Sequence, residues 1–415
     1  MISRTIIFCA FFTFSQLSQP LLAQKNQSLK DSIAKYRTGV VVIKTTPNTT
    51  VELEQQSHEF WFGAAISNSI FDGSASQQDV QKYKEIFLEN FNSAVTENAL
   101  KWGTMERQRG MVDFFTVDNM LAWTDEHNIP LRGHNLYWGI DKFVQDWVKE
   151  LNDEELYQQL HTRARTIAAR YKDRFAEYDL NNEMIHGNFY EDRLGPGITK
   201  QMAEWIKNYD PETELYLNDY DILTGRMLDE YVTHVNNLLD QDVPIGGIGV
   251  QGHLHAEDFD PEALQNALDE LAQFKLPIKV TEFNMPGQRS KYYQNRDLTM
   301  TAAEQKQKAQ NLVDYYRICF AHPAVDGILM WGFWAGANWI PVSSLYQRDW
   351  SPTPAAEAYQ QLIYDEWWTE YSGKSDREGN CIIPAFFGTH KVKVNGKEKT
   401  IDLKQETGVA YLELK

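Results

Sequence analysis

Cysteine is scarce in this chain of 415 residues, which contains only three. Cys9 lies in an N-terminal stretch that we expect to be removed, so the mature chain keeps Cys319 and Cys381. Two cysteines cannot build a disulfide-stapled scaffold, and the fold must therefore depend on a hydrophobic core. The sequence leaves open whether these two thiols pair or stay free.

Long apolar runs are absent beyond the N-terminus. Residues 1–23 combine one early cation, Arg4, with an apolar stretch from Thr5 to Phe14 and small or apolar residues up to Ala23. This pattern predicts a signal peptide cleaved between Ala23 and Gln24. Its apolar stretch is shorter than the roughly 20 residues of a membrane helix. We therefore expect a secreted protein, periplasmic or extracellular, without a membrane contact after cleavage.

Basic residues are also fewer than acidic ones: the chain has 40 Lys and Arg and 58 Asp and Glu, which gives a net charge of −18. Such a surface repels phosphate backbones, so nucleic acid is not an expected partner. A neutral polymer meets no such repulsion. Aromatic residues, in contrast, make up 13% of the chain and include twelve Trp.

Eight short apolar runs recur along the chain, each followed by a polar loop and then a helical stretch. They are FWFGAAI from Phe60, SAVTE from Ser93, PLRGHN from Pro130, EYDLNNE from Glu177, ELYLND from Glu214, GIGVQGH from Gly247, PIKVTEFN from Pro277 and GILMWGFW from Gly327. This alternation predicts an α/β fold, a (β/α)8 TIM barrel rather than an open doubly wound sheet. No glycine-rich phosphate loop follows the first run, so we expect no nucleotide cofactor.

Both ends of the chain carry strand-like segments outside this pattern. Residues 40–46 and 50–55 flank Pro47-Asn48 and predict a hairpin. Asn395-Gly396 between alternating runs predicts a second hairpin, and GVAYLEL predicts one more strand. We expect a signal peptide at 1–23, an N-terminal β-hairpin segment at 24–57, the barrel at 58–370 and a C-terminal β extension at 371–415. The two terminal segments would pack together as a small β extension that adds stability, sugar binding being the less favoured role.

Polar side chains cluster at the ends of the expected strands, where a (β/α)8 barrel places its functional face. Seven of the eight ends carry amides, carboxylates or histidines, and burying so many polar groups without a function would be costly. In strand order they include Glu97, Asn98, Lys101 and Trp102; His134 and Trp138; Asn182 and Glu183; Asn218, Asp219 and Tyr220; Gln251 and His253; Glu282 and Asn284; then Trp331, Trp334 and Trp339. Each alone has an ordinary structural explanation, but their joint pattern favours a site.

Two glutamates, Glu183 and Glu282, end strands that should face each other across the barrel mouth. Glycoside hydrolysis needs one protonated carboxylic acid and a second, ionised carboxylate opposite it. We therefore expect Glu183 to be the acid and Glu282 its partner, with Asn182 bonding a substrate hydroxyl. Tryptophans offer flat faces on which sugar rings can stack.

A metal site is the rival interpretation, since His253-Leu254-His255 resembles the His-x-His pair of barrel metallohydrolases. In those enzymes the pair closes the first strand, whereas here it closes the sixth. His134 is the only other histidine at a strand end. We therefore expect no metal.

The motifs TENALKW, RGHNLYW, NNE, LYLNDY, VQGH, VTEF and WGFWAGANW resemble, in order and position, those of glycoside hydrolase family 10. The resemblance covers residues 60–368 and implies a secreted, retaining endo-β-1,4-xylanase that works on xylan or xylo-oligosaccharides as a monomer without metal or cofactor. It implies that Glu183 is the acid/base and Glu282 the nucleophile. Further roles that it implies are sugar contacts for His134, Asn182 and Gln251, support of the nucleophile by His253, a grip on the next sugar by Glu97, Asn98 and Lys101, and aromatic walls from Trp138, Trp331 and Trp339.

Two positions depart from the family pattern. Tyr178 replaces a usual Trp, and Asn284 stands where the family usually has Asp. The asparagine removes a negative charge beside His253, so rate and pH optimum stay open. NNEMIHG and the terminal β segments resemble a branch seen in plants and some bacteria. Two alternatives also stay open: the same mechanism on a mixed-linkage glucan or an algal xylan, and a carbohydrate-binding protein without catalysis.

Overall fold

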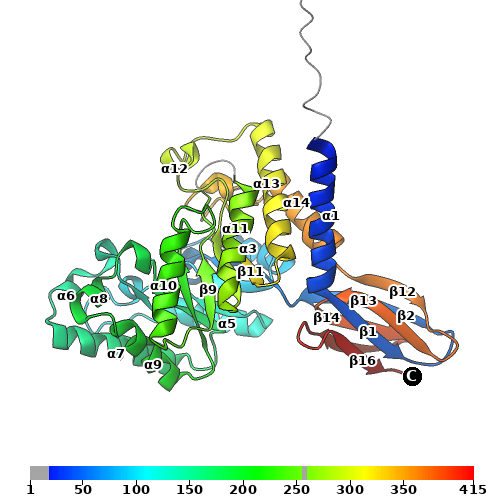
Figure 1. The fold of residues 1–415 in the computed structure, drawn as a ribbon, viewed down its shortest axis with the longest axis horizontal. Coiled ribbons are helices and arrows are strands. Elements are labelled where there is room, and N and C mark those ends of the chain that lie inside the picture. The colour runs from blue at the N-terminus through cyan, green and yellow to red at the C-terminus, as the bar shows by residue number, and fades with distance from the viewer. Residues whose placement is uncertain (1–17, 255–258) are drawn as a thin grey trace, which may run out of the picture.

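The computed structural model of the protein describes residues 18–254 and 259–415. Helix α1 (Ser18–Arg37) leads into two β regions, a barrel and a smaller β sandwich that lies beside it (Figure 1). The predicted signal peptide falls mostly outside the described residues, and α1 spans its expected cleavage point. No helix in the described part of the chain is long and apolar enough to cross a membrane.

The predicted (β/α)8 barrel is confirmed. Its eight parallel strands are β3 (Trp61–Ile66), β4 (Ser93–Thr96), β5 (Leu131–Gly133), β7 (Glu177–Asn182), β8 (Glu214–Asp219), β9 (Gly247–Val250), β10 (Ile278–Phe283) and β11 (Val325–Met330). Pairing of β11 with β3 and of β5 with β7 closes the sheet. A two-residue strand, β6 (Tyr137–Trp138), pairs with the end of β7.

Helices connect and surround these strands. They are α2 (Asn68–Phe71), α3 (Gln77–Asn90), α4 (Trp102–Met105), α5 (Phe115–His127), α6 (Asp146–Lys149), α7 (Asp153–Arg170), α8 (Phe189–Leu194), α9 (Ile198–Tyr209), α10 (Leu228–Asp240), α11 (Pro261–Leu271), α12 (Lys291–Gln294), α13 (Ala302–Ala321) and α14 (Pro354–Gln360). Short helical turns are η1 (Asp141–Phe143), η2 (Met184–His186), η3 (Ala272–Phe274), η4 (Pro341–Ser343) and the π-helical η5 (Gln361–Glu366). Capping boxes start the two longest of these barrel helices, at Asn152 for α7 and Thr301 for α13.

The N-terminal hairpin prediction is wrong, although both of its strands exist. Strand β1 (Thr38–Lys44) pairs with β13 (Asn380–Phe386) and β16 (Val409–Glu413), whereas β2 (Thr50–His58) pairs with β12 (Glu370–Lys374) and β14 (Gly388–Val394). The turn after β1 therefore carries the chain from one sheet to the other. Alternating residues of the two sheets, such as Val41 and Leu53, face each other in one buried cluster, so hydrophobic burial decided the pairing.

The second hairpin is confirmed, because β14 pairs with β15 (Lys397–Leu403) across Asn395 and Gly396, both with positive φ. GVAYLEL forms strand β16 as predicted. The question of the two thiols is also answered. Cys319 lies in the core of the barrel region and Cys381 in the core of the sandwich, and both are free.

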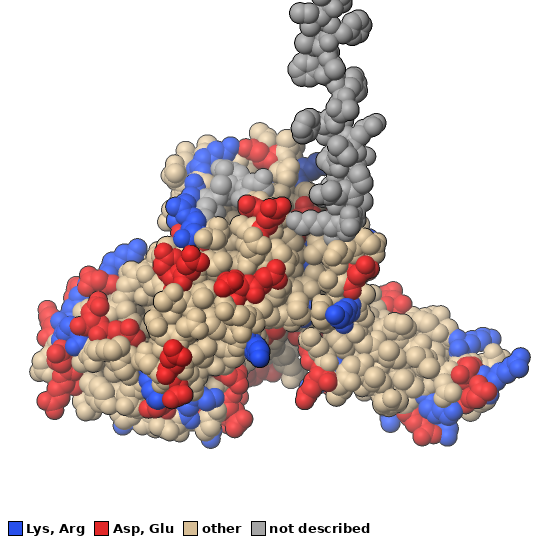
Figure 2. Space-filling model, viewed as in Figure 1, with Lys and Arg blue, Asp and Glu red and all other residues tan. Residues whose placement is uncertain are grey.

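On the face in view, acidic and basic side chains are interspersed over the helices of the barrel, with wide areas of uncharged surface between them (Figure 2). Basic side chains gather there only in small groups. A polyanion therefore meets no continuous positive surface on this face.

Candidate active site

A register irregularity in β7 precedes Glu183, and another spans Glu282 in β10. Strand β7 slips against β8 between Asp179 and Asn182, and β10 slips against β11 between Val280 and Phe283. Strict alternation would place side chains three residues apart on opposite faces of a strand. The slips allow Asp179 and Asn182 to contact the same network inside the barrel. Glu183 then leaves the strand with φ 61°, a left-handed conformation uncommon for a residue other than glycine.

Glu183 is held by two neutral donors. The Trp138 indole Nε1–H donates to Oε2 over 2.9 Å, and the Gln251 amide Nε2–H donates to Oε1 over 2.8 Å. Burial raises the pKa of the Glu183 carboxyl, and the negative charges of Glu282 and Asp219 raise it further against these two hydrogen bonds. A carboxyl in this setting is suited to keep a proton.

Glu282 contacts a different set of side chains from Glu183. Asn218 Nδ2 donates to its Oε1 over 2.9 Å, and His253 Nε2 lies 3.1 Å from its Oε2. Burial raises the pKa of Glu282, but His134, His253 and Lys101 lower it more strongly, to about 2. Glu282 is thus an ionised carboxylate across the physiological range, opposite a carboxyl that tends to be protonated.

A buried ionic network lies under Glu282, inside the barrel. Arg132 pairs with both Glu177 and Asp179, and Lys279 Nζ lies 2.6 Å from Glu177 Oε2. Asp179 in turn accepts from His134, with Nδ1 2.7 Å from Oδ2, and that nitrogen lies 3.8 Å from Glu282. The network fixes His134 beside the carboxylate. The predicted site residues do not include Arg132, Glu177, Asp179 or Lys279, although all four lie on predicted strands.

Glu97, Asn98 and Lys101 form a second polar group at the end of β4. Lys101 Nζ donates to Asn98 Oδ1 over 2.8 Å and lies 4.9 Å from the centre of the Trp138 ring. Burial raises the pKa of Glu97 to about 7, against the positive charge of Lys101. Burial also lowers the pKa of Lys101, opposed by the surrounding carboxylates. These side chains offer both donors and acceptors to a hydroxyl-rich ligand.

Aromatic rings form the walls of the site. Trp138 stacks on Phe143 with ring centres 3.7 Å apart, while Trp339 packs against His253 at 5.1 Å and Tyr293 at 5.3 Å. Trp331 meets the His134 ring edge to face at 5.1 Å. The buried indole Nε1–H of Trp339 has no hydrogen-bond acceptor among the described residues. A ligand hydroxyl could serve as that acceptor.

One cavity of about 310 Å³ brings together all twelve predicted site residues. It is lined by Glu97, Asn98, Lys101, His134, Trp138, Asn182, Glu183, Gln251, His253, Glu282, Trp331 and Trp339. Five further lining residues were not predicted as part of the site: Lys142, Phe143, Tyr220, Gln288 and Tyr293. Of these, only Tyr220 had a signal, its place at the end of a predicted strand. The other four lie on loops and short helices, where neither periodicity nor strand position marks them.

The metal interpretation gains no support. Within residues 18–254 and 259–415, no three His, Cys, Asp or Glu side chains are arranged to hold a metal ion. His253 instead spans Glu282 and Asn284 with its two ring nitrogens. His255 lies outside the described residues.

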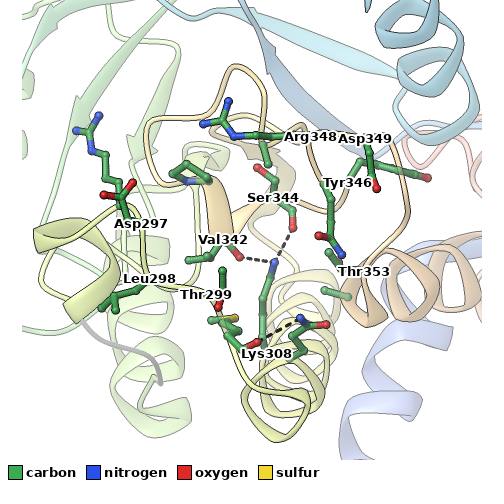
Figure 3. A pocket seen from close by; sticks show the side chains of 17 residues that line it. Asp297, Leu298, Thr299, Lys308, Val342, Ser344, Tyr346, Arg348, Asp349 and Thr353 are labelled. Carbon is green, nitrogen blue, oxygen red and sulfur yellow. Dashed lines mark hydrogen bonds between the residues drawn. The ribbon is translucent and has the colours of Figure 1, made fainter.

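A larger cavity, about 530 Å³, lies between α13, the loop that precedes it and the segment that follows β11 (Figure 3). At its base Lys308 donates to the carbonyl oxygens of Val342, at 2.8 Å, and Ser344, at 2.6 Å. Burial lowers the pKa of Lys308 to about 7. This lysine fastens the turn that follows Trp339 to α13, which is a structural role. Its two lining carboxylates, Asp297 and Asp349, lie on different sides of the cavity (Figure 3), and none of the twelve predicted site residues lines it.

The fold and the site together define a (β/α)8 barrel with two glutamates of opposite protonation tendency at the carboxyl ends of its strands. Residues 52–362 match the model of glycosyl hydrolase family 10, and the chain belongs to this family. The resemblance identified from the motifs is therefore confirmed.

Several known proteins are similar to this chain. An anti-sigma-I factor, RsgI6, of Acetivibrio thermocellus is 31% identical over 88% of this chain and 46% of its own length. Endo-1,4-beta-xylanase 3 of Arabidopsis thaliana is 31% identical over 83% of this chain and 43% of its own length. The chain thus spans less than half of each relative. Xylanase 10B of Thermotoga petrophila, solved with xylobiose, superposes with a TM-score of 0.65 over 74% of this chain and 95% of its own, at 24% identity, and supports the fold.

Proposed function

We propose that the protein is a retaining endo-β-1,4-xylanase that hydrolyses internal bonds of xylan. The observation that carries the proposal is the contrast between Glu183, whose pKa is raised, and Glu282, whose pKa is lowered to about 2, across one cavity. The family and a xylanase among the relatives support the substrate. The neutral amides and indole rings of the cavity suit an uncharged sugar polymer.

The mechanism has two steps. Glu282 attacks the anomeric carbon while Glu183 donates its proton to the leaving oxygen, and a covalent glycosyl-enzyme forms. Glu183, now ionised, then removes a proton from a water molecule that attacks the same carbon, and Glu282 is released. Asn218 and His253 hold Glu282 in place, while Trp138 and Gln251 do the same for Glu183.

The decisive experiment incubates the mature protein with a panel of purified polysaccharides, including xylan, mixed-linkage glucan and an algal xylan. Products are resolved by chain length, and Glu282→Gln serves as the inactive control. We expect xylo-oligosaccharides from xylan with retained anomeric configuration. Release from another β-glycan alone would overturn the substrate, and inverted products would overturn the mechanism.

A binding role is the second candidate, because one relative is named an anti-sigma-I factor rather than a hydrolase. The same cavity would then hold a glycan without cutting it. Retention on xylan without release of reducing sugar would favour this role over catalysis.

We further propose that the protein is secreted and acts as a monomer. The support for secretion is the charge and hydropathy pattern of residues 1–23. N-terminal sequencing of protein from the culture fluid or periplasm should give Gln24 as the first residue, and light scattering should give one chain. An uncleaved N-terminus on cell-retained protein would contradict the first expectation.

A further inference from the structure

His253 bridges the proposed nucleophile and an asparagine. Its Nε2 lies 3.1 Å from Glu282 Oε2, and its Nδ1 lies 2.9 Å from the atom placed as Asn284 Oδ1. The imidazole is buried, and the indole rings of Trp331 and Trp339 pack around it. Each ring nitrogen thus has one partner. The number of protons on the ring depends on whether each partner donates or accepts the hydrogen bond.

Two orientations of the Asn284 amide give two protonation states of His253. With the amide oxygen facing Nδ1, that nitrogen must carry a proton, and Nε2 must carry another to bond the carboxylate. His253 would then be an imidazolium, and Asn284 Nδ2 is buried without a hydrogen-bond acceptor among the described residues. A half-turn of the amide exchanges its nitrogen and oxygen while keeping its shape. Nδ2 then donates to Nδ1, and a neutral ring still donates from Nε2 to Glu282.

The charges around His253 favour the neutral ring. Strand β10 presents Glu282, and the segments after β5 and β4 present His134 and Lys101 to the same carboxylate. Glu183, after β7, is another acid near Glu282, and Asp179 of β7 holds His134 beside it. Among the described residues after β11, the aromatic side chains that pack against His253 are the indole rings of Trp331 and Trp339. A buried imidazolium would therefore share one carboxylate with Lys101, with no second anion at Nδ1, which is unfavourable in a desolvated site.

We propose that Asn284 donates its amide N–H to His253 Nδ1 and so holds the imidazole neutral, with its Nε2–H donating to Glu282. The inference rests on the proposed function, because Glu282 is the nucleophile only there. Asn284 acts through His253 and is a positioning residue. Glu282 then receives a hydrogen bond from His253 but no positive charge from that ring. Its carboxylate therefore stays more basic than it would be if an aspartate at position 284 kept His253 charged.

The direct test is nitrogen NMR of the ring in protein labelled with ¹⁵N-histidine, at pH 7 and without substrate. The His253 signals are assigned by their loss in His253→Gln. We expect one protonated and one unprotonated ring nitrogen in the natural protein, and two protonated nitrogens in Asn284→Asp. Two protonated nitrogens in the natural protein would overturn the proposal.

The second test is the pH profile of kcat/KM on xylo-oligosaccharides. Asn284→Asp should move the acid limb to lower pH by about one unit, because the charged ring favours ionised Glu282. The matched control, Gln288→Glu, adds a carboxylate to the same cavity without contacting His253, and should move the limb upward instead. An Asn284→Asp limb that stays in place or moves upward would sink the inference.

The two tests separate this inference from the proposed function. If the natural protein cuts no glycan but His253 carries a single ring proton, the function fails and the placement of the proton stands. If it cuts xylan but the ring carries two protons, only the inference about Asn284 fails.

Discussion

The surroundings of Glu183 and of Glu282 differ in one respect above all, which is charge. Glu282 is buried and Glu183 is partly buried, and each lies within hydrogen-bond distance of two side chains. Those of Glu183 are an indole and a primary amide, whereas Glu282 has Lys101 and two histidines close by. Burial raises the pKa of each, yet only for Glu282 do Lys101 and two nearby histidines lower the pKa by more than burial raises it.

The comparison shows that hydrogen bonding alone does not decide which carboxyl keeps its proton. Neutral donors lower the pKa of Glu183 too little to cancel its burial and the repulsion from Glu282. Of the groups that lower the pKa of Glu282, His134 is held in turn by the ionic network inside the barrel, through Asp179. The assignment of acid and nucleophile therefore depends in part on Asp179 and Arg132, which do not line the cavity.

The largest expected effect comes from removing either carboxyl. Glu282→Ala should lower kcat at least about 10⁴-fold on every substrate, because no covalent intermediate can form. Glu183→Ala should lose as much on xylan but retain the first step on an aryl glycoside, whose good leaving group needs little acid help. The measurement is turnover with burst kinetics on both kinds of substrate.

Azide separates the two roles. It needs no general base, so it should restore turnover of the aryl glycoside by Glu183→Ala and yield a β-glycosyl azide. Rescue of neither variant, or a β product from Glu282→Ala, would show that the roles are assigned wrongly.

The next effect is on stability. Glu177→Gln removes the carboxylate that Arg132 and Lys279 share inside the barrel and leaves both cations short of a partner. We expect a loss of about 3–5 kcal/mol in the free energy of unfolding. Urea and thermal unfolding measure it. The matched control is Glu54→Gln in the sandwich, where an exposed carboxylate also meets two lysines, Lys391 and Lys393, and no change in Tm is expected. Equal losses from both would contradict the network's role.

A smaller effect is expected from the aromatic wall. Trp339→Ala removes a stacking face and an indole N–H without an acceptor among the described residues, at the edge of the cavity. We expect KM to rise about tenfold, since a ring contact of this kind contributes roughly 1 kcal/mol or somewhat more. Steady-state kinetics and isothermal calorimetry with the Glu282→Gln background measure it. A drop in Tm with unchanged affinity would instead make Trp339 a packing residue.

The smallest expected effect is a shift in pH dependence. Trp138→Phe keeps a ring against Phe143 but removes the donor to Glu183, a bond that favours the ionised carboxyl. The pKa of Glu183 should rise further, so the basic limb of kcat/KM should move to higher pH by about half a unit, given roughly 1 kcal/mol per hydrogen bond. The acid limb, set by Glu282, should not move. A basic limb that moves downward would contradict the role given to Trp138.

Much of this architecture could be predicted because the signals were local. Short apolar runs, each followed by a polar end, mark the eight strands and their functional face. Asn395-Gly396 marks its hairpin for a similar reason, since both residues accept positive φ. The turn at Pro47-Asn48 gave an equally local signal and misled, because two buried faces, not the turn, decided that β1 and β2 enter separate sheets.

The sequence by itself determined the barrel, the order of its strands and the twelve side chains that gather at its mouth, because periodicity and strand position are written in neighbouring residues. Only the tertiary structure decided the register slips beside Glu183 and Glu282, the ionic network of Arg132, Glu177 and Lys279, and the contribution of Phe143 and Tyr293. These features join residues far apart in the chain. The charge that a buried carboxyl carries depends on distances of a few ångströms to such residues, and no local pattern encodes those distances.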